Sequence, residues 1–107
     1  GPDRPTAIFC HGDSAAVDLI QQVRRNGLEV PRDLSVVGFD DLPLASACHP
    51  PITTIRQPIR DMAARAVRVL IDLIAGVKEG KERAAVHRET VAPQLVCRES
   101  TAAPGMP

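Results

Sequence analysis

The most informative hydrophobic pattern lies at residues 34–41, where a short β-branched run is closed by two carboxylates. These positions read Leu-Ser-Val-Val-Gly-Phe-Asp-Asp, with Pro31 and Asp33 just before them. A continuous apolar run of this length predicts a strand buried on both faces, as in a parallel sheet. Ligands of open parallel sheets bind beyond the carboxyl ends of the strands. We therefore expect this strand to deliver Asp40 to the mouth of a pocket.

A second strand is predicted earlier in the chain, at residues 6–10, and an amphipathic helix follows it. Apolar residues at positions 16, 19, 20 and 23 recur at helical spacing, with polar residues between them. Asp13 is placed to cap this helix, and Asn26-Gly27 is a typical end signal. A strand, a helix and a strand joined by short loops form a right-handed βαβ unit, so we expect the two strands to pair in parallel.

The pattern after residue 41 predicts a further set of elements. Asp41 is expected to cap a short helix that carries Pro43 in its first turn, where the missing N–H costs nothing. The expected elements are a short helix at 42–48, a strand at 52–56, a long helix that starts at Pro58 and ends between 76 and 80, and weaker strands at 86–91 and 95–98. The tail that begins at Ser100 is rich in Ala, Pro and Gly and is expected to be disordered.

Composition and charge limit the classes of function. The 107 residues are 44% hydrophobic and 24% charged, which is typical of one globular domain or part of one. No apolar run approaches the roughly 20 residues that span a membrane. The 13 basic and 13 acidic residues cancel, and no basic stripe is present, so these residues are not expected to bind DNA themselves. The chain opens with Gly-Pro, and we expect it to be a fragment of a longer protein.

The cysteines indicate neither a disulfide framework nor a metal centre. Cys10, Cys48 and Cys97 are odd in number and widely spaced, which fits a reducing cytoplasm. Two of them directly precede a histidine, which could suggest a metal site. Adjacent residues of a strand point to opposite faces, however, and zinc ligands recur at turn or helical spacing, so joint ligation by these pairs is disfavoured. We therefore expect no metal, no cofactor and no enzymatic activity.

Four motifs together closely resemble the C-terminal part of the lactose-repressor/galactose-repressor (LacI/GalR) family of bacterial transcription regulators. They are Pro-Thr-Ala-Ile-Phe-Cys at 5–10, Val-Pro-Arg-Asp-Leu-Ser-Val-Val-Gly-Phe-Asp-Asp at 30–41, Pro-Pro-Ile-Thr-Thr-Ile-Arg-Gln-Pro at 50–58, and Val-Cys-Arg-Glu-Ser at 96–100. A lone Gly-Phe-Asp would be weak, because sugar-binding relatives share it. The spacing of Gly-Phe-Asp from the motif at 50–58 makes the resemblance specific. The resemblance covers nearly the whole chain.

The resemblance implies a partial periplasmic-binding-protein-like fold of type I, a three-layer α/β/α arrangement around a parallel sheet, mainly its C-terminal lobe. Residues 1–100 would form the C-terminal part of an effector-binding and dimerisation domain, and residues 101–107 a disordered tail. The N-terminal helix-turn-helix and most of the first lobe would be absent. The helix from Pro58 would normally pack on that absent lobe, so we expect the fragment to self-associate.

The function implied is that of a repressor in which a sugar or related metabolite, bound between two lobes, switches operator binding. The partners would be this effector, a second subunit, and operator DNA contacted through the absent N-terminal domain. An extracytoplasmic sugar or solute receptor of a transporter is the alternative, although such receptors typically lack the motif at 50–58.

The resemblance also assigns roles to individual residues. Asp40 would accept hydrogen bonds from effector hydroxyls or ring nitrogens; the alternative is a loop carboxylate with local backbone bonds. Asp13 would belong to the same site, where it more often orients the loop than touches ligand. Many members carry Asn at the position of Gly12, so a sugar cannot be assumed here. His11 beside it can substitute, unless it is an ordinary loop histidine.

A dimer interface is the other site that the resemblance implies. The segment before Pro50 and the first helix would contribute to a two-fold contact, and burial in the core of one chain is the alternative. The candidate interface residues are Ala16, Ile20, Leu44, Ala47 and Cys48.

Overall fold

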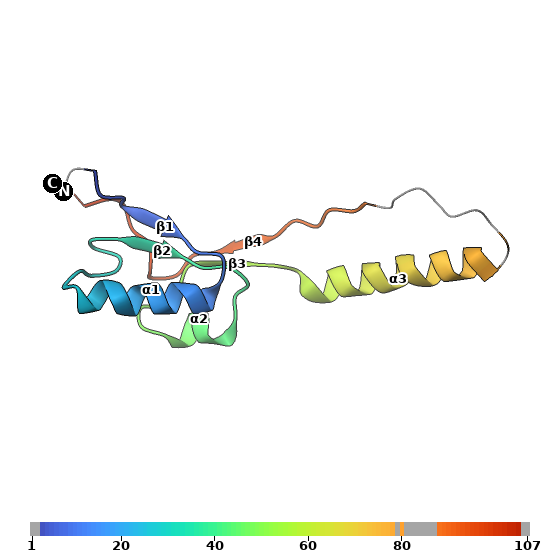
Figure 1. Cartoon of the computed structure of the whole chain (residues 1–107), viewed down its shortest axis with the longest axis horizontal. Coiled ribbons are helices and arrows are strands. Elements are labelled where there is room, and N and C mark those ends of the chain that lie inside the picture. The colour runs from blue at the N-terminus through green and yellow to red at the C-terminus, as the bar shows by residue number, and fades with distance from the viewer. Residues whose placement is uncertain (1–2, 79, 81–87, 106–107) are drawn as a thin grey trace. The chain divides into compact units, whose positions relative to one another are not determined.

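The computed structural model describes residues 3–78, 80 and 88–105, and the chain divides into two compact units. The first unit comprises Gly1–Gln57 and Gln94–Pro107, and the second comprises Pro58–Pro93. The elements of the first unit are β1 (Ala7–Phe9), α1 (Asp13–Arg25), β2 (Ser35–Val37), α2 (Pro43–Ala47), β3 (Thr54–Arg56) and β4 (Gln94–Val96) (Figure 1). The second unit contains α3 (Ile59–Lys78).

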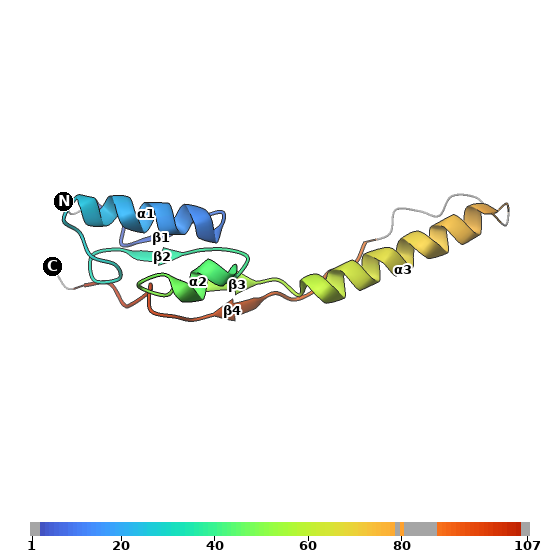
Figure 2. The ribbon, with the colours of Figure 1, turned by 90° about the horizontal axis from the view of Figure 1, so that it is seen from below.

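The strands of the first unit confirm the predicted parallel βαβ arrangement. β1 and β2 are parallel, with Ala7 opposite Ser35. β2 then meets the segment ahead of β3 through a parallel bridge between Val37 and Thr53, and the Gly38 amide donates to the Thr53 carbonyl at 2.9 Å. β3 pairs with β4 in antiparallel orientation. β4 begins one residue before the strand expected at 95–98. Figure 2 shows the four strands in this order.

The helices of the first unit cover one face of these strands. α1 contacts both β2 and α2, and Figure 1 shows α1 and α2 on the same side of the strands. The parallel α/β class is therefore confirmed, and the first unit contains two of the three expected layers. α3 belongs to the second unit.

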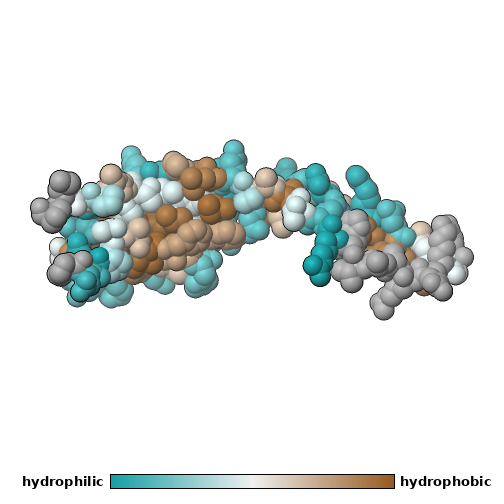
Figure 3. All heavy atoms as spheres, turned by 90° about the horizontal axis from the view of Figure 1, so that it is seen from above, coloured by the Kyte–Doolittle hydropathy of each residue, from teal (hydrophilic) through white to brown (hydrophobic). Residues whose placement is uncertain are grey.

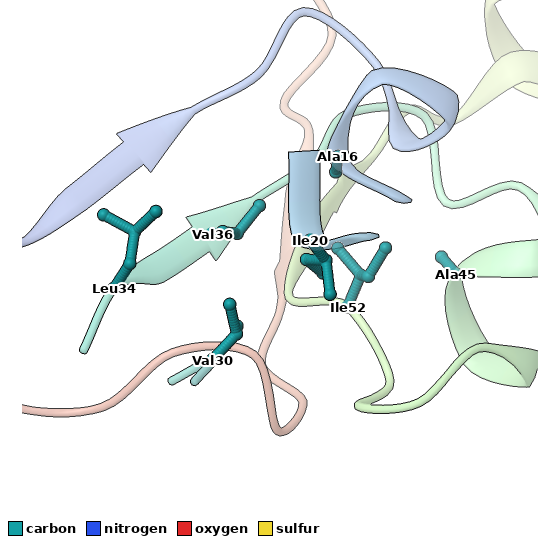
Figure 4. Close-up of a cluster of buried hydrophobic side chains, with 7 residues drawn as sticks. All are labelled: Ala16, Ile20, Val30, Leu34, Val36, Ala45 and Ile52. Atoms are coloured by element: carbon teal, nitrogen blue, oxygen red, sulfur yellow. The ribbon is translucent and has the colours of Figure 1, made fainter. Parts of the chain in front are cut away.

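The core lies between α1, α2 and the strands. Its seven buried hydrophobic residues are Ala16, Ile20, Val30, Leu34, Val36, Ala45 and Ile52 (Figure 4). Each fully buried aliphatic side chain of the size of Val or Ile contributes roughly 1.5–3 kcal/mol. Such a small cluster makes the polar contacts of the unit important for its stability.

The ends of the short elements were predicted with mixed success. α1 stops where expected: Gly27 has a φ of 81°, and the Leu28 amide donates back to the Val23 carbonyl at 3.1 Å. The two predicted aspartate caps are wrong. Gly12 and Leu42 occupy the N-cap positions of α1 and α2, and neither position has a side-chain cap. Both aspartates have other partners, which are described below.

The segment after β4 returns to the sheet. Ser100 is fully buried; its hydroxyl donates to the Val36 carbonyl at 2.6 Å and accepts from the Thr53 amide at 2.9 Å. Ala102 exchanges two hydrogen bonds with the Ser35 hydroxyl, at 3.0 and 3.1 Å. The expectation of a disordered tail is therefore wrong for residues 100–102, because the sequence pattern does not reveal these bonds. Residues 106–107 lie outside the described part.

The second unit consists mainly of α3, whose predicted bounds are confirmed. None of its residues is buried, and Arg65 pairs with Asp61 and Glu89 at 3.2 and 3.4 Å. Its exposed large hydrophobic side chains are Ile59, Met62, Val67, Leu70, Ile71, Leu73, Ile74 and Val77; part of this apolar surface is visible in Figure 3. Of the weak strand expected at 86–91, residues 88–91 are not a strand and the others lie outside the described part. No helix among the described residues is long and apolar enough to cross a membrane.

Candidate functional site

The candidate site lies where three loops leave the carboxyl ends of the parallel segments. The Asp13 amide, after β1, donates to the Phe39 carbonyl at 3.1 Å. The Asp40 amide, after β2, donates to the Ile55 carbonyl of β3 at 2.9 Å. These bonds join the loops after β1 and β2 to each other and to β3, at the edge of the sheet where parallel α/β folds bind ligands.

Asp40 occupies this edge in an uncommon backbone conformation. Its φ is 102°, in a region that side chains rarely adopt, and the residue is half-buried. Its Oδ1 accepts a hydrogen bond from Gln57 Nε2 at 2.7 Å. Strain of this kind persists only where the surroundings enforce it, and it is common at ligand sites.

Asp13 organises the loops from inside. It is fully buried, its Oδ1 accepts from the Thr54 hydroxyl at 2.7 Å, and its Oδ2 accepts from the Leu42 amide at 2.7 Å. A Cβ on Gly38 would collide with Asp13 Oδ1, so glycine lets the two loops approach. The carboxylate of Asp13 is buried and engaged by protein donors, which favours the loop-orienting role for this residue, and a direct contact with effector stays a prediction.

Asp41 is bound between two arginines. Its carboxylate accepts from Arg98 and Arg56, each at 2.7 Å, and its side chain is only 10% exposed. Burial alone would raise its pKa, but the two arginine hydrogen bonds outweigh burial and hold the pKa of Asp41 below the ordinary 3.8. Arg98 also donates to the Ile52 carbonyl at 3.0 Å, so it joins the Asp41 loop to the start of the third parallel segment.

Of the other two positions singled out beside the first strand, one is exposed and the other is half-buried with space beside it. His11 is exposed, and Gly12 has extended backbone, with nothing within 4 Å of where a Cβ would stand. Nearby, the rings of Phe9 and Phe39 lie 6.5 Å apart, and Phe9 is 64% exposed. A ligand at this edge would therefore meet aromatic surface and space beside Gly12 as well as a carboxylate.

Sequence reasoning missed the partners that hold the carboxylates. Thr54 binds Asp13, Gln57 binds Asp40, and Arg98 binds Asp41. All three belong to the motifs that carry the family resemblance, but nothing in their spacing says which carboxylate each would reach. Among the described residues, no group of three or more His, Cys, Asp or Glu side chains is arranged to hold a metal ion.

The candidate interface residues divide into two groups. Ala16 and Ile20 are 0% and 4% exposed and belong to the core, which favours the alternative of core packing for these two residues. Ala47 is exposed, and Leu44 and Cys48 are half-buried, so these three still offer surface to a partner. The Cys48 thiol lies 3.2 Å from the Pro50 carbonyl, and burial raises its pKa, which disfavours a reactive thiolate.

Comparison with known proteins gives a consistent result. Residues 1–101 match the model of the periplasmic binding protein-like domain. The chain is 47% identical over 102 residues to the HTH-type transcriptional regulator MalR of Streptomyces coelicolor, covering 94% of this chain and 28% of that protein. It also superposes on the lac repressor dimer bound to operator and the anti-inducer ONPF (TM-score 0.77, 32% identity, 92% of this chain and 32% of that one). A third match is the transcriptional regulator CelR in complex with cellobiose (TM-score 0.77, 30% identity, 92% and 28%).

The chain thus spans about a third or less of the length of these relatives. The matches extend across both units and include all four sequence motifs. The chain therefore belongs to the periplasmic binding protein-like domain family, in the group of LacI/GalR transcription regulators.

Proposed function

We propose that this chain is the C-terminal portion of the effector-binding and dimerisation domain of a LacI-type transcriptional regulator. A small molecule, either a sugar or a related metabolite, would bind at the Asp40 edge and switch the operator affinity of the whole protein. The supporting observation is Asp40 itself, which combines a parallel-strand terminus, a φ of 102° and a half-buried carboxylate. A carboxylate in this setting suits hydroxyl and N–H donors of a small ligand.

The relatives support this assignment over a transport receptor. They are transcription regulators, one solved on operator DNA and another with cellobiose. In this protein the operator would be bound by another part of the polypeptide, since the formal net charge of the chain is zero. The protein would act in the cytoplasm and without catalysis.

Two surfaces are proposed for self-association. The half-exposed side of α2, with Leu44, Ala47 and Cys48, would serve a two-fold contact, for which the lac repressor dimer is a precedent. The wide apolar face of α3 is exposed in the described residues and would drive association of the isolated chain at high concentration.

The first experiment reads the open frame upstream of Gly1. A helix-turn-helix encoded in the same frame would support the transcriptional regulator. A signal peptide without a basic DNA-binding domain would instead support the receptor of a transporter.

The full-length product is then tested for operator binding by fluorescence anisotropy, with mono- and disaccharides and nucleosides as probes. Asp40→Asn is expected to keep operator binding and to lose the response to the active probe. Asp18→Asn, which changes an exposed carboxylate of α1, is the control and should respond normally. An unchanged response of Asp40→Asn would refute the role of Asp40.

A further inference from the structure

Gln57 has two properties that no other residue of the site combines. Its side-chain amide donates to Asp40 Oδ1 at 2.7 Å, and it is the last residue before the chain passes from the first unit to the second, at Pro58. The next residue, Pro58, begins the second unit and accepts the first hydrogen bond of the α3 region, from the Met62 amide at 2.9 Å. One side chain thus connects the candidate effector carboxylate to the point where the second unit starts.

The neighbouring carboxylates are held by much stronger contacts. Asp41 accepts from two guanidinium groups, and Asp13 is fully buried with a donor on each oxygen. Within the described part of the chain, the side chain of Asp40 has the Gln57 amide as its hydrogen-bond donor. A neutral amide binds a carboxylate less strongly than a guanidinium does, so a ligand donor can replace Gln57 far more readily than it can replace Arg98.

The backbone bonds around Asp40 do not involve its carboxylate, so only side-chain bonds would change if a ligand replaced Gln57. The Asp40 amide donates to the Ile55 carbonyl at 2.9 Å, and the Asp41 amide donates to the Thr54 hydroxyl at 3.3 Å. The loop after β2 is therefore tied to β3 at two successive residues, whether or not the Asp40 carboxylate changes partner. The group that would lose its partner in such an exchange is the Gln57 side chain, next to the start of the second unit.

We propose that Gln57 is the positioning residue of Asp40, and that a hydroxyl or N–H donor of the effector replaces its amide at Asp40 Oδ1 and so loosens the start of the second unit. This inference rests on the proposed role of Asp40 in effector binding. By reciprocity, a change that holds Gln57 away from Asp40 favours effector binding, because the effector no longer competes with the amide.

The test uses the 107-residue chain without any effector. Asp40→Gly removes the carboxylate and tolerates a φ of 102°, and Asp40→Asn keeps an acceptor oxygen at the same place. NMR measures solvent exchange of the Gln57 side-chain amide protons and the backbone order of Gln57 and Ile59. We expect Asp40→Gly to accelerate the side-chain exchange about tenfold and to lower the order at both residues. Asp40→Asn is expected to restore much of the wild-type behaviour.

The matched control is Arg56→Met, at the adjacent position. It removes a contact to Asp41 and leaves the Gln57 contact intact, so the Gln57 signals should stay as in the wild type. Unchanged side-chain exchange in Asp40→Gly would overturn the positioning role. Faster exchange with unchanged order at Ile59 would overturn the link to the second unit. Because no effector is present, either failure leaves the proposed function to its own test, the probe response of full-length Asp40→Asn.

Discussion

Replacing Arg98 by methionine removes the guanidinium that joins Asp41 to the start of the third parallel segment and keeps most of the apolar stem. Two hydrogen bonds are lost: 2.7 Å to the Asp41 carboxylate and 3.0 Å to the Ile52 carbonyl. The Arg98 and Asp41 side chains are 17% and 10% exposed, so solvent replaces these bonds poorly. A hydrogen bond to a charged group contributes about 1.5–3 kcal/mol, and we expect Arg98→Met to lower the free energy of unfolding by about 2–3 kcal/mol.

Arg56→Met is the matched comparison, because Arg56 binds the same carboxylate at the same 2.7 Å. Its side chain is 51% exposed, so solvent screens the pair and the expected loss is at most about 1 kcal/mol. Urea unfolding followed by far-UV circular dichroism measures both. Double-mutant cycles with Asp41→Asn, which tolerates the φ of 55°, isolate the pair energies. Equal losses of stability for the two arginine variants, or a larger coupling energy for Arg56, would refute the argument that burial determines how much each ion pair contributes.

The same pair predicts a pH dependence. The pKa of Asp41 is lower in the folded chain than its ordinary 3.8, so the unfolded chain binds a proton first as the pH falls. The stabilisation is therefore fully present above about pH 4 and is lost as the pH falls through the lowered pKa. The stability difference between the wild type and Asp41→Asn should shrink over this range, and a difference that is constant from pH 7 to pH 2 would contradict the assignment.

Three further predictions test the other contacts. Gly38→Ala, whose Cβ would collide with Asp13 Oδ1, should destabilise the chain by about 1–3 kcal/mol in urea unfolding. Gly12→Ala, with open space around its Cβ, should change the free energy of unfolding by less than about 0.5 kcal/mol. Equal effects of the two substitutions would contradict the close approach of Gly38 to Asp13. Ser100→Ala leaves a buried carbonyl and a buried amide without their partner and should cost about 2–3 kcal/mol; a loss below about 0.5 kcal/mol, as for a disordered tail, would argue against the docked segment. Leu70→Glu, on the exposed apolar face of α3, should convert the chain to monomer in sedimentation at high concentration, and a wild-type chain that is already monomeric there would refute self-association through α3.

The sequence by itself determined most of the helices and strands and the class of fold, although residues 88–91 of the weak strand expected at 86–91 are not a strand. Short β-branched runs, a 3.6-residue apolar rhythm and Gly27 at a helix end are local signals, and the structure confirms the elements that they predict. The resemblance motifs identified the family, which the comparisons confirm. The position of Asp40 after a parallel strand also follows from the sequence alone, because topology places strand ends at the ligand edge.

Only the tertiary structure decided what each carboxylate does. Asp13 and Asp41 both lie at the starts of predicted helices, and the local pattern predicts a cap for either one. Their actual partners, Thr54 and Arg98, lie 41 and 57 positions away in the chain. A cap requires only neighbours in sequence, whereas a buried carboxylate binds whichever donors the fold brings to it, and folding favours the arrangement in which no buried charge is left unpaired. Ser100 was misjudged for the same reason: its partners are distant in sequence, and its Ala-, Pro- and Gly-rich surroundings resemble those of a disordered tail.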